Sequence, residues 1–338
     1  MEAERRSLQI GTVVVIGALL LRLLGGGALE ALAQAFAKPE VASFLLYLET
    51  GRVIRPAAPQ IPRETIPEET EAPTEAPTQP EEVLSPVFSP EDAALVDIRN
   101  YCGYEADTAD LLTQPLCWNL KQDVPTVLIL HSHGSESYEN TEGYEASSAY
   151  RTLDSRYNMI SIGEHLAKLL ESAGIRVIHD QTLHDYPSYN GAYDNARAAI
   201  QTYLSQYPEI CLVLDLHRDA AETADGEQFR STVATSKGDA AQLMLVVGTD
   251  AGGLDHPNWE QNLSLAVKLH AQLEKTIPGI CRSISFRSQR FNQDLSNGGV
   301  LVEVGAAGNT RQEALLATEY LADTIIALAS GATANSTN

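Results

Sequence analysis

The sequence predicts an α/β domain over residues 95–330, with a mostly parallel central sheet flanked by helices. Two observations lead to this prediction. Short apolar runs alternate with longer segments of helical periodicity from about residue 95 onward. The apolar runs are continuous and do not alternate with polar residues, which is typical of strands buried on both faces of a parallel sheet.

The elements follow one another in regular order. The expected strands are 124–130, 175–178, 210–216, 243–247 and 300–304. The expected helices are 158–173, 194–206, 258–274 and 311–328. Gly174 is expected to end the first helix, and Asp194 to cap the second. We find no internal repeat, so a single catalytic or binding domain is expected.

An apolar segment lies near the N-terminus. Residues 8–24 contain one charged side chain, Arg22, and two arginines precede the segment. This pattern predicts a membrane-spanning signal anchor within residues 1–35, with its short basic end in the cytoplasm. A signal peptide cleaved near residues 31–35 is the alternative. Both interpretations place the rest of the chain outside the cytoplasm.

The remaining segments differ in composition from the domain. Residues 36–54 are expected to form a juxtamembrane segment, and residues 331–338 a short tail. Residues 55–94 are rich in Pro, Glu and Thr, which cannot bury enough apolar surface to fold. This stretch is expected to be a disordered spacer between the membrane and the domain.

Charge and cysteine content exclude some functions. The chain has 45 acidic residues against 23 Lys and Arg, a formal net charge of −22, and no basic stripe, which argues against nucleic-acid binding. Its cysteines are Cys102, Cys117, Cys211 and Cys281, and no Cys-x-x-Cys occurs, so a thiolate metal site is not expected. Cys102 and Cys117 could form a disulfide outside the cytoplasm, or all four could be free thiols.

Polar side chains lie in or directly after three of the predicted strands. They are His131, His133 and Glu136 after the first strand, His217 and Arg218 at the end of the third, and Glu303 within the last. The carboxyl ends of parallel strands meet at one edge of the sheet, where α/β folds bind ligands. These side chains are therefore expected to gather in one site.

Residue types and spacing in this set suit a zinc ion. A catalytic zinc takes three protein ligands and keeps one position for water. His133, Glu136 and His217 are the expected ligands. His131 is an alternative to His133, because only one of these two neighbouring histidines is expected to point at the metal. Asp154 is an alternative to Glu136.

Glu303 is the expected general base, which would take a proton from the attacking water and return it to the leaving amine. A buried ion pair with an arginine is the alternative for this residue. Arg218 is a second candidate catalytic residue. Just before the last strand, four polar residues are expected to bind substrate, with the guanidinium groups suited to a peptide carboxylate: Arg287, Arg290, Asn292 and Gln293. Alternatively they form an ordinary polar loop.

The chain resembles a known family, the stage II sporulation protein P family of endospore-forming bacteria. The resemblance lies in FLLYLETG at 44–51, VLILHSHGSESY at 127–138, YRTLD at 150–154, LDLHRD at 214–219, FNQDLS at 291–296 and LVEVG at 301–305. Each piece alone is weak, but their common order and spacing are specific.

The resemblance implies a membrane-bound N-acetylmuramoyl-L-alanine amidase with the fold of zinc amidases of the cell wall. It implies peptidoglycan as substrate, possible endopeptidase cleavage of cross-links, and a role in engulfment during sporulation. The implied partners are a lytic transglycosylase, stage II sporulation protein D, and a membrane protein, stage II sporulation protein M. By position it assigns His133, His217 and Glu303 to the site. The wider zinc-amidase pattern favours Asp154 over Glu136 as the carboxylate ligand.

Two other functions fit the residues. A zinc carboxypeptidase or other amidohydrolase would use the same His-x-x-Glu pair and distant histidine, with Arg287 or Arg290 binding a terminal carboxylate. A non-catalytic, membrane-anchored wall-binding module would use the polar strand ends to hold a ligand. Zinc content of the purified domain would distinguish an enzyme from such a module.

Overall fold

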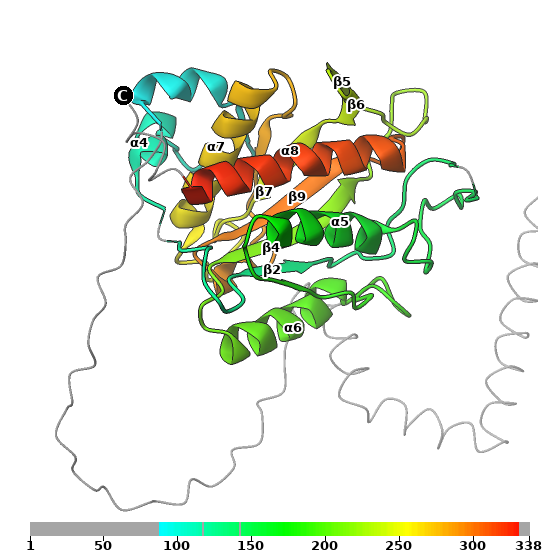
Figure 1. Cartoon of the computed structure of the whole chain (residues 1–338), viewed down its shortest axis with the longest axis horizontal. Coiled ribbons are helices and arrows are strands. Elements are labelled where there is room, and N and C mark those ends of the chain that lie inside the picture. The colour runs from blue at the N-terminus through cyan, green and yellow to red at the C-terminus, as the bar shows by residue number, and fades with distance from the viewer. Residues whose placement is uncertain (1–87, 117, 142, 331–338) are drawn as a thin grey trace, which may run out of the picture. The chain divides into compact units, whose positions relative to one another are not determined.

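The computed structural model describes residues 88–116, 118–141 and 143–330 (Figure 1). The predicted membrane anchor, the juxtamembrane segment, the tail and most of the spacer lie outside these residues. Within the described part of the chain, no helix is long and apolar enough to cross a membrane.

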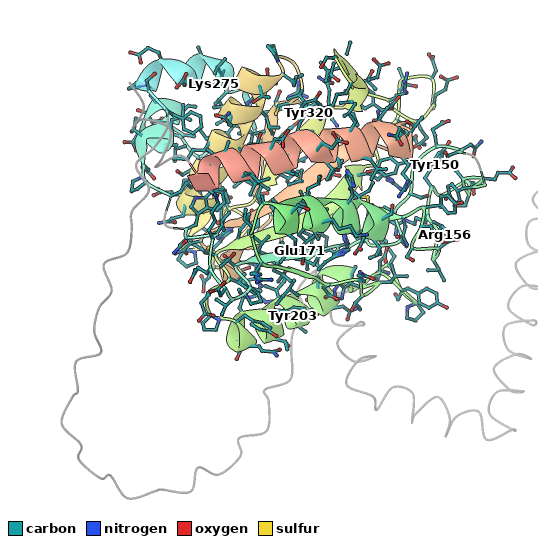
Figure 2. The ribbon with its side chains drawn as sticks, viewed as in Figure 1. Tyr150, Arg156, Glu171, Tyr203, Lys275 and Tyr320 are labelled. Atoms are coloured by element: carbon teal, nitrogen blue, oxygen red, sulfur yellow. The ribbon has the colours of Figure 1, made fainter. Side chains whose placement is uncertain are left out.

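The end of the predicted spacer packs on the domain. Residues Pro90–Leu95 form a 3-10 helix, η1. The Asp92 carboxylate lies 2.7 Å from Lys275 Nζ, and the same ammonium lies 4.9 Å from the centroid of the buried Phe88 ring (Figure 2). The folded domain therefore includes residues that composition alone assigns to the spacer.

The central sheet has seven strands in the order β1-β8-β7-β9-β4-β2-β3. In chain order they are β1 (Ile98–Asn100), β2 (Val127–Leu130), β3 (Val177–His179), β4 (Leu212–Asp219), β7 (Leu243–Val247), β8 (Ile284–Phe286) and β9 (Gly299–Ala306). A separate antiparallel hairpin contains β5 (Thr232–Thr235) and β6 (Gly238–Ala241). The predicted α/β fold with a mostly parallel sheet is confirmed.

One pairing in the large sheet is antiparallel. β7 runs opposite to β9, whereas all other neighbouring strands of this sheet are parallel. The sheet is thus two parallel blocks, β1-β8-β7 and β9-β4-β2-β3, that point in opposite directions. The three strands expected to carry the site, β2, β4 and β9, belong to the same block, so their carboxyl ends do meet at one edge.

Helices cover both faces of the sheet. They are α4 (Thr108–Thr113), α5 (Met159–Ser172), α6 (Ala192–Gln206), α7 (Trp259–Thr276) and α8 (Arg311–Ser330). α5 and α8 lie side by side on one face and α6 lies on the other (Figure 1). The main apolar core fills the α5, α7 and α8 face, and a smaller cluster that includes Leu128, Leu130 and Ile200 lies under α6.

Local signals explain the ends of two helices. Asn158 caps α5, because its side chain accepts a hydrogen bond from the Ile160 amide, and Gly174 follows the helix with a φ of +82°. The prediction that Asp194 caps α6 is wrong. Gly191 occupies the cap with a φ of +94°. Asp194 lies in the first turn, where a negative charge interacts favourably with the helix dipole.

Candidate active site

Strand pairing brings His217 and Glu303 together. The two residues are direct partners in the register of the parallel strands β4 and β9, at the centre of the sheet. Side chains of register partners project from the same face of a sheet. His133 and Glu136 follow β2, the other neighbour of β4. The sequence-predicted residues from three separate strands therefore meet at one edge.

The three predicted metal ligands lie close to one another. The rings of His133 and His217 are 5.4 Å apart between centroids and nearly perpendicular. His217 Nδ1 lies 3.5 Å from Glu136 Oε2. The Nδ1 atom of His133 is buried and has no hydrogen-bond partner among the described residues. Two imidazoles and a carboxylate thus share one small volume, with a ring nitrogen left unused.

Glu303 carries a carboxyl group without a partner. Its Oε2 atom is buried and accepts no hydrogen bond, and no ion pair joins Glu303 to a basic side chain within the described ranges. Burial is the main cause that raises the pKa of Glu303 to about 8, and the nearby carboxylate of Glu136 adds to it. Among the described residues, no arginine lies close enough to form the ion pair that was the alternative for Glu303. The carboxyl group can exchange a proton near neutral pH.

His217 sits between two carboxylates. Burial by itself lowers the pKa of this imidazole, but Asp215 and Glu136 outweigh it, so the pKa lies well above its ordinary value. His217 Nε2 is 2.9 Å from Asp215 Oδ1, an ion-pair distance, although the N–H direction does not make a hydrogen bond. Asp215 accepts hydrogen bonds from the Ser132 amide and hydroxyl at 2.8 and 2.6 Å. Asp215 is therefore fixed by Ser132 and forms an ion pair with His217.

Sequence reasoning gave Asp215 no role, although the signal was present. Asp215 is an acidic residue between the apolar residues Leu214 and Leu216 of β4, two positions before a candidate ligand. The same signal identified Glu303. A carboxylate that orients a histidine ligand is a common second layer of zinc sites.

Arg218 holds the loop that follows β2. Its Nε donates to the Ser137 carbonyl at 3.0 Å and its Nη2 to the Tyr150 carbonyl at 2.9 Å. The Arg218 backbone amide also donates to Glu136 Oε2 at 3.3 Å. The third guanidinium nitrogen, Nη1, lies 3.9 Å from Glu136 Oε1. The described contacts of Arg218 therefore hold Glu136 and the loop after β2 in place.

A second network, which the sequence did not reveal, fixes Glu136 from the other side. Arg151 donates to Asp185 at 3.0 Å and to Glu136 at 3.4 Å. Ser135 donates to the same Asp185 through its amide and its hydroxyl. Arg151 and Asp185 lie in polar loops, whose composition carries no signal for such a contact.

The alternative ligands lie elsewhere. His131 has partners at both ring nitrogens: Nδ1 is 3.0 Å from the Leu216 carbonyl and Nε2 is 2.9 Å from His179 Nε2. Burial lowers the pKa of His131 to about 3. Asp154 is bound by Arg156 at 2.6 Å, which lowers the pKa of Asp154 to about 2, and Arg156 extends from the loop region before α5 (Figure 2). No described contact joins Asp154 to His133 or His217.

Tyrosines cover the candidate ligands. Tyr189, which is 54% exposed, stacks on His133 with ring centroids 4.3 Å apart and planes within 9°. The Arg151 guanidinium carbon lies 4.3 Å from the centroid of the same tyrosine ring. Tyr193, at the start of α6, lies edge-on to His133 at 5.4 Å and parallel to His217 at 6.2 Å. Sequence reasoning missed both tyrosines, although Tyr186, Tyr189 and Tyr193 lie close together in the sequence.

The four predicted substrate-binding residues fall in three places. Arg290 and Asn292 line a cavity of about 420 Å³. Gln293 is buried, and its side chain bonds to the Val246 carbonyl and the Gly248 amide. The guanidinium of Arg287 lies 4.3 Å from the Tyr101 ring centroid, outside the residues that line this cavity.

Zinc binding stays a prediction. Among the described residues, no group of three or more His, Cys, Asp or Glu side chains is arranged as a metal site. The donor set nevertheless has the chemistry that zinc prefers, with the unpartnered His133 Nδ1 beside His217 and Glu136. Cys102, Cys211 and Cys281 form no disulfide with one another. Cys117 lies outside the described residues, so the disulfide between Cys102 and Cys117 stays a prediction.

Comparison with known proteins identifies relatives of the chain. Stage II sporulation protein P of Bacillus subtilis (strain 168) is 28% identical over 215 residues, which cover 60% of this chain and 50% of that protein. The chain thus spans about half the length of this relative. A crystal structure of an N-acetylmuramoyl-L-alanine amidase from Clostridium difficile 630 matches 64% of the chain and 100% of its own, at 15% identity and a TM-score of 0.35.

A family model gives the widest match. The model of stage II sporulation protein P (SpoIIP) matches residues 39–326, which include the whole candidate active site and the segment at 44–51. The chain belongs to the stage II sporulation protein P family.

Proposed function

We propose that this protein is a zinc-dependent peptidoglycan hydrolase that cleaves the amide between N-acetylmuramic acid and the L-alanine of the stem peptide. One observation carries the proposal: an unpartnered, proton-holding carboxyl group, Glu303, stands in register with His217, beside His133 and Glu136. Hydrolysis of an amide needs a group that accepts a proton from water and donates it to the leaving amine. Membership of a sporulation family supports peptidoglycan as the substrate.

His133, His217 and Glu136 are the residues proposed to hold zinc. When bound there, zinc would polarise the amide carbonyl and lower the pKa of a water molecule. The neighbours of these residues favour this set over the alternatives, because both ring nitrogens of His131 already have protein partners and Asp154 is bound by Arg156.

Glu303 is proposed to move the proton. Its ionised form accepts a proton from the attacking water, and the protonated form then donates it to the amine of L-alanine. Without bound metal, burial raises the pKa of Glu303 to about 8, so this carboxyl group can both accept and donate a proton near neutral pH. Asp215 holds His217, while Arg218 and Arg151 hold Glu136, so these three residues position the site without touching the substrate.

Location and partners follow from the sequence and the family resemblance. We propose that residues 8–24 anchor the protein in the membrane and that the domain acts outside the cytoplasm on septal wall during engulfment. Stage II sporulation proteins D and M are the proposed partners. Cleavage of glycan by a lytic transglycosylase would complement removal of stem peptides from the same wall, because each reaction cuts a different bond.

The products formed from purified sacculi test the proposal. The full-length chain should contain close to one zinc ion per molecule and should release peptides with a new N-terminal L-alanine. A new amino group on the cross-linking residue would instead indicate endopeptidase cleavage, and release of single C-terminal amino acids a carboxypeptidase. A folded chain that binds sacculi, contains no zinc and releases nothing would be a wall-binding module, and that result would overturn the proposal.

A further inference from the structure

A cavity of about 420 Å³ adjoins the candidate active site. Its walls come from the start of α6, from the connection between β7 and α7, and from residues 288–292 between β8 and β9. Tyr193 belongs to both places, because its ring lines the cavity and also faces the rings of His133 and His217. Tyr193 is therefore the residue that the cavity shares with the surroundings of the candidate ligands.

The cavity is built by tight backbone contacts. Phe291 and Asn292 are consecutive non-glycine residues in the left-handed region, with φ of 50° and 61°. The Asn292 side chain fixes this conformation by donating to the Tyr193 carbonyl at 2.8 Å. On the opposite wall, a Cβ atom on Gly252 would come within 2.5 Å of the Ser288 carbonyl oxygen. Strain of this kind persists at sites where the surrounding structure and function require it.

Arg290 gives the cavity a cation with unused donors. Its described contacts are both weak and both made by Nη1, to Asp294 Oδ2 at 3.3 Å and to the Asp255 carbonyl at 3.5 Å. In contrast, both terminal nitrogens of Arg197 donate hydrogen bonds to the Asp294 carboxylate, at 2.8 and 2.7 Å. Arg290 thus keeps Nε and Nη2 for a ligand, and these two N–H groups form one side of the guanidinium fork that binds a carboxylate with two hydrogen bonds.

The rest of the lining is largely apolar. Tyr193, Phe291 and Leu254 contribute to it, and Leu254 is 58% exposed. Small aliphatic side chains such as that of alanine can pack against such a surface, whereas the hydroxyl groups of a sugar would lose hydrogen bonds to water there. Asp194 and Arg197 also line the cavity, and both terminal nitrogens of Arg197 are bonded to Asp294. Arg290 is therefore the lining arginine with unused donors among its described contacts.

We propose that this cavity binds the stem peptide, on the side of the scissile amide that leaves as the amine, and that Arg290 pairs with the free α-carboxylate of an acidic second residue. The ligand class is a short acidic peptide. The inference rests on the proposed amide hydrolysis, and it adds which substrate part enters the cavity and which side chain selects it. Arg287 has no part in this recognition, because it lies against Tyr101 outside the cavity.

Two muramyl tripeptides that differ at one group provide the test. One carries glutamate with a free α-carboxylate as its second residue, and the other carries the same residue with that carboxyl amidated. For the full-length zinc-loaded chain, Arg290→Gln should raise KM for the carboxylate peptide by about 10- to 100-fold, the range for loss of a hydrogen-bonded charge pair, with kcat little changed. The KM for the amidated peptide should stay constant, and Arg290→Lys should recover part of the loss.

Arg176→Gln is the matched control. It removes the same charge from an exposed arginine that precedes β3, at the edge of the sheet opposite to the candidate active site, and should change neither KM. Melting temperatures of all variants check that they are folded. Equal KM values of the unmodified chain for the two peptides would overturn the inference, as would an Arg290→Gln variant that raises both KM values alike.

Failure of the inference is distinguishable from failure of the proposed function. If the unmodified chain hydrolyses neither peptide, the proposed reaction is wrong. Binding of the same peptides to a Glu303→Gln chain, measured by calorimetry, then tests the cavity without turnover. Tighter binding of the carboxylate peptide, lost when Arg290→Gln is added, supports the inference. Equal binding of the two peptides to the Glu303→Gln chain contradicts it.

Discussion

Replacing Glu303 by glutamine should reduce hydrolysis and increase stability at the same time. Glutamine keeps the shape of the side chain but cannot accept a proton at neutral pH. General acid–base groups contribute typically 10²- to 10⁴-fold to rate, so kcat for release of stem peptides should fall by about that much. Zinc content should not change, because Glu303 is not one of the proposed ligands.

The gain in stability follows from the pKa of Glu303. This pKa is about 8 in the folded protein, against an ordinary value of 4.5. The unfolded chain therefore loses the proton at a lower pH than the folded chain, and the free energy of unfolding decreases as pH rises from 4.5 through 8. Each pH unit in this window corresponds to about 1.4 kcal/mol, so the carboxyl group costs up to about 3 kcal/mol at pH 7.

A glutamine side chain at this position has no carboxyl proton to lose, so Glu303→Gln should remove this cost. Denaturant unfolding in the presence of a chelator, at pH 4 and pH 7, measures the effect without bound metal. The variant should match the unmodified chain at pH 4 and exceed it at pH 7. A variant that is less stable at both pH values, with activity per folded molecule intact, would refute the reasoning and restore the ion-pair interpretation of Glu303. Loss of zinc would instead make Glu303 a ligand.

Three further predictions concern the ligands, the packing and the anchor. His133→Ala and His217→Ala should each lose zinc and wall hydrolysis together, while His131→Ala should keep zinc; metal analysis showing the reverse pattern for the two neighbouring histidines would contradict the assignment. Gly163→Ala should destabilise the domain by about 1–3 kcal/mol, because its Cβ would lie 2.5 Å from the Nε2 atoms of two buried imidazoles, and an unchanged melting temperature would contradict that packing. Deleting residues 1–35 should release an active hydrolase from the membrane fraction, whereas a folded, zinc-loaded truncation without activity would show that this segment does more than anchor.

The sequence predicted the strands of the site better than the rest of the fold. Continuous apolar runs mark β2, β4 and β9, and a charged residue within such a run, as with Glu303, signals a role beyond packing. The strands β1 (IRN) and β8 (ISF) are short and interrupted by polar residues, so neither forms a continuous apolar run. No local signal shows that β7 runs antiparallel to β9. Direction in a sheet is set by long-range packing, which a single sequence does not display.

Within the site, too, the residues on or next to strands were predicted and the loop residues were not. His133, His217 and Glu303 belong to strands or directly follow them, so the order of strands was enough to bring them together. Arg151 and Asp185 reach Glu136 from two loops that are far apart in the chain, and polar loop residues are expected on any surface. Only the folded geometry separates those that support the site from those that face solvent.

The place of β9 in the sheet has a consequence for how the protein is made. β9 is the last strand in the chain, yet it pairs with β4 on one side and with β7 on the other. During synthesis, the block β4-β2-β3 and the block β7-β8-β1 cannot join until residues Gly299–Ala306 have emerged, and both blocks expose an unpaired edge until then. The same strand carries Glu303. An activity that depends on this residue would therefore appear only when the whole sheet is assembled, and chains that end earlier would lack both Glu303 and the strand that joins the two blocks.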